Sequence, residues 1–198
     1  MSLELVNTLA TFGTFFVIAA TAIAALVQLR HSRSSNQIVV LNEIRETMDS
    51  PEFQAARHFV ETELPTKLQD PAFRLQFAER RLRRTRETQP LFEKINVIGN
   101  FWENVGVFVK AGLLDRDLAL DLWSGVSIGT WNRFAPLTAV ARRTNFALWE
   151  NFEYLTMLSQ DFQAAHANGT YPVGARRLEL KDEWLEADKQ YAASLAPA

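Results

Sequence analysis

The chain has 198 residues, a formal net charge of −2 and no cysteine. A net charge this close to zero argues against a nucleic-acid-binding protein, and the missing thiols exclude disulfides, thiolate metal sites and cysteine nucleophiles. Once one apolar segment near the N-terminus is set aside, about 170 residues remain, which is enough for one domain with its own core.

An uncharged run over residues 5–29, bounded by Glu4 and Arg30, is the feature around which the chain is organised. An α-helix needs about 20 mainly apolar residues to cross the core of a bilayer, so we predict a transmembrane helix over residues 5–29. A cleaved signal peptide fits less well, because it begins with basic residues and has a shorter apolar core. Arg30 and Arg33 follow the run, so the positive-inside rule predicts that residues 1–4 lie outside and the rest of the chain in the cytoplasm.

Small side chains gather on one side of this predicted span. One stripe at helical spacing consists of Gly13, Val17, Ala20, Thr21 and Ala24, and bulky residues such as Phe15 and Leu26 lie opposite. Small residues allow helix backbones to approach closely in lipid, which indicates a docking face for another membrane helix. An ordinary alanine-rich anchor shows the same composition, and the sequence leaves both interpretations open.

Proline and capping residues divide the following part of the chain. No proline or glycine occurs between the span and Pro51, so the first helix is expected to continue beyond the membrane. Ser50-Pro51 and Asp70-Pro71 each combine a capping side chain with a proline at the first helical position, which is typical of a helix start. Pro65 and Pro90 are expected to end the two helices that begin there.

Three longer helices are predicted next. The first ends at Gly112, and its predicted buried face consists of Ile95, Ile98, Trp102, Val105 and Val109. Asp115 caps the second, whose predicted inward face consists of Leu118, Leu122, Val126 and Trp131. Pro136 is expected to kink or end it, and residues 145–167 form the third.

No segment alternates convincingly between apolar and polar residues, so the sequence predicts an all-α protein. Residues 30–167 are expected to form a cytoplasmic bundle of about five to six helices. A loop and an acidic C-terminal helix or tail around Trp184 and Tyr191 follow over residues 168–198.

Five arginines lie close together near the middle of the chain: Arg80, Arg81, Arg83, Arg84 and Arg86. On a helix these side chains would point to several sides. A solvated helix surface explains them, and so does a contact with anionic lipid headgroups or with an acidic protein partner. RNA binding lacks any accompanying fold signature.

Residues that carry catalysis or bind cofactors are not arranged in a recognisable motif. The histidines His31, His58 and His166 are far apart, so no paired metal ligands are predicted. The Gly125–Gly129 segment has a G-x-S-x-G spacing but lacks the strand that a nucleophile elbow requires. Its glycines instead indicate a close helix crossing. Most aromatic residues are expected in the core. We therefore predict neither an enzyme nor a metal, nucleotide or other cofactor site.

Four runs carry a resemblance to a known family: residues 19–36, 50–71, 100–115 and 149–155. With these runs the chain resembles, over residues 5–165, a bacterial family of membrane-anchored proteins that is catalogued only as a domain of unknown function. The resemblance implies a single-pass helical protein of the bacterial inner membrane. It transfers no functional residue, because none of the runs is a catalytic signature.

Together these features predict a non-catalytic interaction module, an accessory or scaffolding subunit of a larger membrane complex, with other integral-membrane subunits as partners. The alternative is a membrane-tethered sensor that binds a small ligand between its helices. A large cavity lined by Trp and Phe would favour the sensor, and a packed aromatic core would favour the scaffold.

Overall fold

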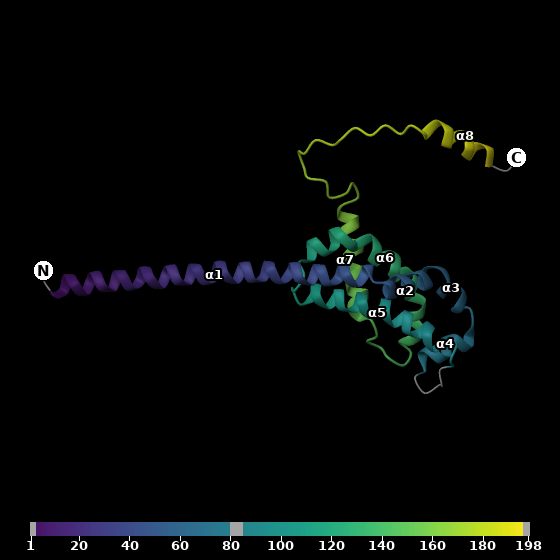
Figure 1. Cartoon of the computed structure of the whole chain (residues 1–198), viewed down its shortest axis with the longest axis horizontal. Helices are drawn as coiled ribbons and strands as arrows, with labels where there is room; N and C mark the ends of the chain where they lie inside the picture. Colours follow the sequence, from purple (N-terminus) through teal and green to yellow (C-terminus); the bar gives the residue numbers. More distant parts are fainter. Residues whose placement is uncertain (1–2, 80–84, 196–198) are drawn as a thin grey trace. The chain divides into compact units, whose positions relative to one another are not determined.

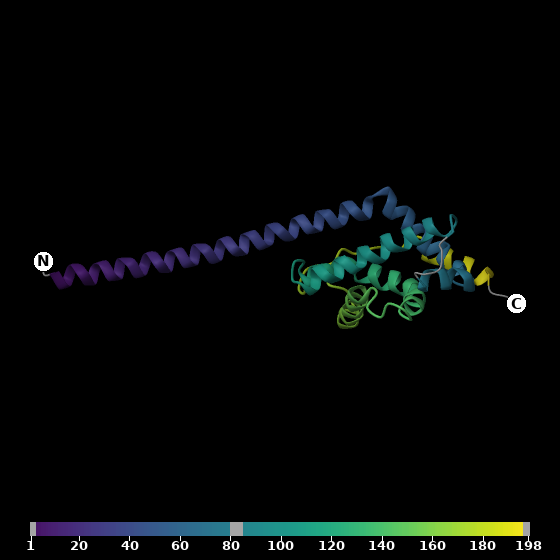
Figure 2. The same cartoon turned by 90° about the horizontal axis from the view of Figure 1, so that it is seen from below.

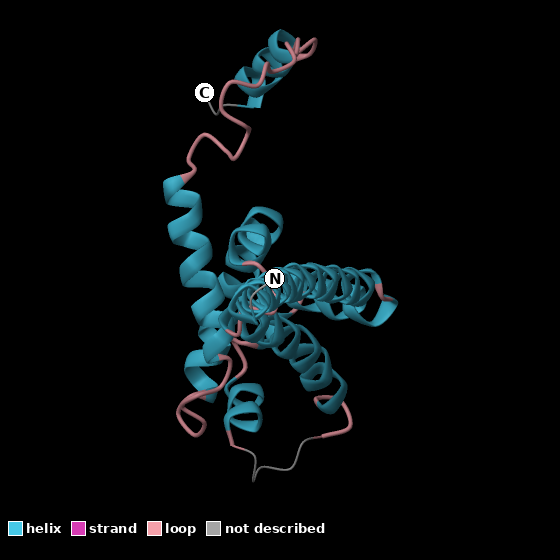
Figure 3. Cartoon of the chain, turned by 90° about the vertical axis from the view of Figure 1, so that its left-hand side faces the viewer, coloured by secondary structure: helices cyan, strands magenta, loops and turns pink. Residues whose placement is uncertain are grey.

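A computed structural model of the protein describes the backbone of residues 3–79 and 85–195, and the side chains in these ranges except those of residues 3–12 and 29–35. Every regular element of this described part is a helix (Figures 1 and 3), which confirms the all-α prediction. The chain divides into two units, Met1–Ala167 and Asn168–Ala198. The first unit contains α1 to α7.

The first helix, α1 (Leu3–Asp49), contains the uncharged run and continues without interruption to the bundle, as predicted (Figure 2). Its C-terminal turns join the core through Ile44, which is buried, and Met48, which is partly buried. Among the residues that the structure describes, no helix is both long and apolar enough to cross a membrane. This finding leaves the transmembrane helix predicted over residues 5–29 without support from the fold.

The predicted caps begin the next helices, α2 (Pro51–Thr62) and α4 (Pro71–Ala78), with the short α3 (Leu64–Lys67) between them (Figure 1). The Ser50 hydroxyl accepts a hydrogen bond from the Phe53 amide at 3.2 Å, and the Asp70 carboxylate accepts one from Ala72 at 2.8 Å. The expectation that this helix extends to Pro90 is wrong. It ends at Ala78, whose carbonyl accepts a hydrogen bond from the Thr144 hydroxyl at 2.6 Å.

The helix α5 (Gln89–Lys110) buries the whole apolar face predicted for it. It packs against α2 on one side and α7 on the other. Gly112 follows in the left-handed conformation, with φ 67°, and allows the chain to turn sharply. The Asp115 carboxylate then accepts a hydrogen bond from the Leu118 amide at 3.0 Å and caps the next helix, as predicted.

The inward face predicted for that helix, α6 (Arg116–Ala141), is largely wrong. Leu118, Leu122 and Val126 are 38–43% exposed, whereas Trp131 is partly buried. The buried face is instead made up of Ala119, Leu120, Trp123, Ser124, Ser127, Phe134, Leu137, Thr138, Val140 and Ala141.

The buried serines explain this difference. The hydroxyls of Ser127 of α6 and Ser159 of α7 lie 2.8 Å apart, so one can donate to the other. The carbonyls of Ser124 and Leu155 lie 3.0 Å and 2.7 Å from them and are acceptors within each helix. Because the hydroxyls are satisfied across the contact, this face can be buried although it is partly polar.

Pro136 lies inside α6 and does not end it. A proline within a helix leaves the carbonyl four residues earlier without its usual amide donor. Here that residue is Asn132, which is exposed, so water can satisfy its carbonyl.

The last helix of the first unit, α7 (Glu150–Ala165), begins five residues later than predicted, because turns occupy the preceding residues. The Arg142 side chain donates to the Leu148 carbonyl at 3.0 Å and pairs with Glu153 of α7 at 2.6 Å. Trp149 then adopts a left-handed conformation, with φ 56°. The chain therefore enters α7 through a tight connection held by side chains.

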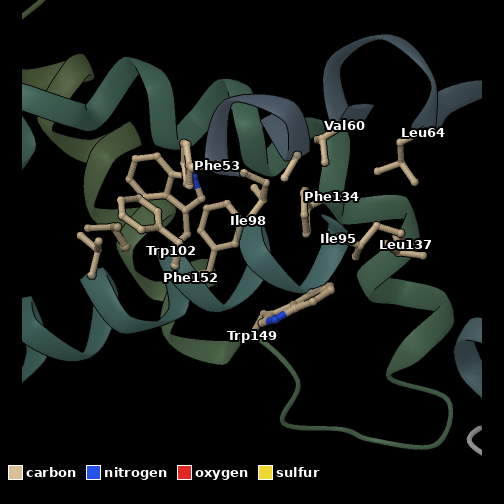
Figure 4. Packing of buried hydrophobic residues seen from close by; sticks show 14 of the residues in the cluster. Phe53, Val60, Leu64, Ile95, Ile98, Trp102, Phe134, Leu137, Trp149 and Phe152 are labelled. Carbon is tan, nitrogen blue, oxygen red and sulfur yellow. The ribbon is translucent and has the colours of Figure 1, made fainter. Parts of the chain in front are cut away.

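Eleven of the 25 buried residues of the core are aromatic, and three more aromatic residues pack against it, so most described aromatic residues belong to the core, as predicted (Figure 4). Phe134 lies between Trp149 and Phe152, with ring centroids 5.1 Å and 5.9 Å away, and Trp102 stacks on Phe152 at 5.9 Å. These rings come from α5, α6, α7 and the turn before α7. The aromatic core thus joins segments that are far apart in the sequence.

Candidate interaction surfaces

Two glycines of α5 lie in close contact with the start of α7 and the residue before it. A β-carbon added to Gly106 would overlap the Asn151 backbone oxygen, and one added to Gly99 would overlap the Trp149 ring. Both glycines are therefore required for the two segments to approach. They are seven residues apart, so they occupy the same side of α5.

Polar side chains of α5 complete this contact. The Glu103 carboxylate accepts hydrogen bonds from the backbone amides of Asn151 and Phe152, both at 3.0 Å, and from the Asn151 side chain at 2.7 Å. The residue that precedes α7, Trp149, provides no side-chain cap of its own. A carboxylate from another helix therefore satisfies the first amides of α7 and complements its dipole.

Two further hydrogen bonds flank this contact. The Trp149 indole donates to Asn100 at 3.2 Å, and the Lys110 ammonium donates to the Asn151 side-chain oxygen at 3.0 Å. The Trp149 indole and the Lys110 ammonium thus each have a hydrogen-bond partner within the contact between α5 and α7. Sequence reasoning missed this contact, although two glycines seven apart inside one helix were a usable signal, because an interior glycine costs about 1 kcal/mol relative to alanine unless packing requires it.

The close crossing predicted at Gly125 and Gly129 does not occur there. A β-carbon at Gly125 would meet the flexible end of Gln163 at 3.4 Å, and one at Gly129 would meet Arg133 of the same helix at 3.7 Å. Both positions lie on the outward side of α6 near Leu122 and Val126. This side is an exposed surface made of apolar and small residues.

The predicted docking stripe on α1 is exposed along its whole length: Gly13, Val17, Ala20, Thr21 and Ala24. The Thr21 hydroxyl donates to the Val17 carbonyl at 2.8 Å, within the helix. The bulky side chains of this part of α1 are equally exposed, at 61–68% of their surface: Phe15, Phe16, Val17, Ile18, Ile23, Leu26 and Val27. All sides of α1 from Gly13 to Gln28 are thus accessible to surroundings outside the bundle.

Four of the five clustered arginines, Arg80, Arg81, Arg83 and Arg84, lie outside the described residues. The fifth, Arg86, is exposed and lies in a turn before α5, so its expected place on a helix is wrong. This turn is held by reciprocal hydrogen bonds of 3.0 Å and 3.1 Å between Thr85 and Thr88. The lipid or acidic-partner contact predicted for the cluster stays a prediction.

One surface groove of about 460 Å³ lies between the start of α6 and the end of α7. Arg116 and Asp117 are at one rim, 3.2 Å apart, and Asp161 and His166 belong to α7 and its end. The His166 ring packs on Phe162 with centroids 4.3 Å apart. Within the described part of the chain, no group of three or more His, Cys, Asp or Glu side chains is arranged to hold a metal ion.

The second unit contains α8 (Leu185–Leu195), in which no residue is buried. Before this helix, the Tyr171 hydroxyl donates to the Arg176 carbonyl at 2.8 Å, and the Arg177 guanidinium lies over the Tyr171 ring at 4.8 Å. Trp184 is 70% exposed and Tyr191 is 66% exposed. By itself this unit has no core.

Comparisons with known proteins place the first unit in a family. A family model described as a domain of unknown function (DUF4760) matches residues 15–157, from within α1 to within α7. No curated protein and no solved structure matches the chain. Because the matched region covers most of the chain and includes both sides of the contact between α5 and α7, the protein belongs to this family of unknown function, DUF4760.

Proposed function

We propose that the protein is a single-pass, membrane-anchored interaction module, an accessory or scaffolding subunit of a larger complex in the bacterial inner membrane. In this proposal residues 5–29 of α1 cross the bilayer, the N-terminus lies outside, and the bundle lies in the cytoplasm. The bundle itself catalyses no reaction.

The exposed apolar surface of α1 carries this proposal. Seven large side chains between Phe15 and Val27 are 61–68% exposed on a helix whose C-terminal end is fixed in the core. Burying one such side chain fully contributes about 1.5–3 kcal/mol, so an apolar environment for this segment is strongly favoured. The uncharged run of the sequence extends beyond the described side chains at both ends and reaches the length that a bilayer requires.

The packed aromatic core supports the interaction module over the alternative of a sensor. Trp102, Trp149 and Phe152 are at most 2% exposed and contact other rings. The groove between α6 and α7 is open at the surface and contains Phe162 as its aromatic lining residue. These three rings are packed within the core, which favours the interaction module.

The small-residue stripe of α1 is the proposed contact with a partner helix, since small side chains allow close packing in lipid. The arginine cluster is proposed to contact anionic headgroups or an acidic partner surface. Neither contact requires a cofactor or nucleic acid.

The test compares three forms of the full chain in native membranes: wild type, the Ala20→Leu, Ala24→Leu pair, and the Phe15→Ala, Leu26→Ala pair as control. We expect all three to stay in the membrane after extraction at alkaline pH. After solubilisation in mild detergent, the leucine pair is expected to reduce the assembly size, because the added side chains fill the stripe, and the control pair to have less effect. Extraction of the wild type at alkaline pH would overturn the anchor, and a wild-type monomer without a companion protein would overturn the scaffold.

A further inference from the structure

The turn between α5 and α6 presents a leucine to its surroundings on a rigid support. Leu113 is 53% exposed, whereas the next residue, Leu114, is 1% exposed and fixes the turn in the core. The amides of Leu113 and Leu114 both donate to the Phe108 carbonyl, at 2.9 Å and 3.1 Å. The outward position of Leu113 is therefore set by the backbone of the turn.

This turn lies at a particular end of the bundle. Figures 1 and 2 both show α5 running toward the N-terminal side of α1, so that the turn is at the end of the bundle toward which the N-terminal part of α1 projects. Among the side chains of α1 that the structure describes, the first buried one is Ile44. It lies 14 residues after Arg30, or about 21 Å along the helix. The 22 residues of α5 span about 33 Å. The helix is therefore long enough to bring the α5–α6 turn back along α1 over much of the roughly 21 Å between Ile44 and Arg30.

The polar groups around Leu113 do not oppose a lipid contact. Arg116 and Asp117 pair at 3.2 Å, and the Asp115 carboxylate caps α6. The Lys110 ammonium donates to the Asn151 side-chain oxygen at 3.0 Å. Leu118 is the next apolar residue along the surface and is 38% exposed.

We propose that the α5–α6 turn, centred on Leu113, rests in the interfacial region of the bilayer that α1 crosses. This inference depends on the anchor proposed above. The contact is apolar, since the formal charges that flank it (Lys110, Asp115, Arg116 and Asp117) sum to zero. It therefore differs from an electrostatic attachment that salt would weaken. It holds the bundle in one orientation against the membrane, so that the side of α6 with Leu122 and Val126 is presented in a fixed direction to a partner.

The sequence contains no cysteine, so a thiol-reactive label attaches only to a cysteine that is introduced for the test. Three single-cysteine forms of the full chain are labelled with a nitroxide in liposomes: Leu113→Cys, Phe146→Cys and Ile23→Cys. Phe146 is the matched control, because it is 89% exposed and lies in the connection at the opposite end of α6. Depth is measured as the ratio of the collision rates of the label with oxygen, which concentrates in lipid, and with a water-soluble nickel chelate.

We expect this ratio to be highest at position 23, several-fold higher at 113 than at 146, and typical of water at 146. Equal, water-like ratios at 113 and 146 together with a lipid-like ratio at 23 would overturn the interfacial contact and leave the anchor intact. A water-like ratio at 23 would overturn the anchor and this inference together.

Discussion

The bundle and the N-terminal part of α1 contain the same kinds of apolar side chain, but the bundle buries them and this part of α1 exposes them. Phe92, Phe134 and Phe152 are 0% exposed, whereas Phe15 and Phe16 are 66% and 68% exposed. In the bundle, helices distant in the sequence return to cover one another. The described side chains of α1 from Gly13 to Gln28 have no such cover. Apolar composition alone therefore does not build a core, and the bundle leaves the described side chains of this part of α1 uncovered.

The largest effect that follows from this comparison is expected at Trp149. Its ring is 2% exposed and lies against Phe134 and Phe77, with centroids 5.1 Å and 6.1 Å away. Trp149→Ala is expected to lower the free energy of unfolding by about 3–5 kcal/mol, since it leaves a large cavity. Urea unfolding in detergent, followed by circular dichroism, measures this change.

Trp184→Ala is the matched control, because Trp184 is 70% exposed in the second unit. A surface substitution of this kind is expected to change the unfolding free energy by less than about 0.5 kcal/mol. Equal effects at the two tryptophans would contradict the division between a covered and an uncovered part of the chain.

A smaller loss is expected at the contact between α5 and α7. Gly106→Ala would place a methyl group against the Asn151 backbone oxygen, and backbone cannot move aside as a side chain can. We expect a loss of about 1–3 kcal/mol, as for other overpacked sites. The same unfolding measurement applies.

Gly129→Ala is expected to change the free energy of unfolding in the opposite direction. Its added methyl group would make an ordinary contact at 3.7 Å with the Arg133 side chain. Alanine is favoured over glycine inside a helix by about 1 kcal/mol, so this variant is expected to be more stable than the wild type. Stabilisation by Gly106→Ala would show that the close contact does not exist in solution.

The features of the fold that could be predicted from the sequence are those that depend on residues close together in the chain. Ser50, Asp70 and Asp115 accept hydrogen bonds from the first amides of their helices, because capping depends on residues two or three positions away. The apolar face of α5 was predicted for a similar reason, since its large residues recur at helical spacing.

Features that depend on contacts between distant segments could not be predicted in this way. The inward side of α6 includes Ser127, which becomes suitable for burial through Ser159 of another helix. The start of α7 depends on Glu103, which is 48 residues before Asn151. Neither partner can be identified from local pattern, so the α6 face and the α7 boundary were misplaced.

The smallest effect is expected in the N-terminal part of α1. The rings of Phe15 and Phe16 contact each other, with centroids 6.2 Å apart, and both are largely exposed. The pair Phe15→Ala, Phe16→Ala removes more apolar surface than Ile44→Ala, a substitution in the same helix at a position that is 4% exposed. If burial inside the bundle decides stability, the double variant should leave the unfolding free energy of the bundle in detergent within about 0.5 kcal/mol of the wild type. Ile44→Ala should lower it by about 2–5 kcal/mol. The reverse order would mean that the exposed part of α1 folds back onto the bundle in solution, and the contrast between the two regions would then be lost.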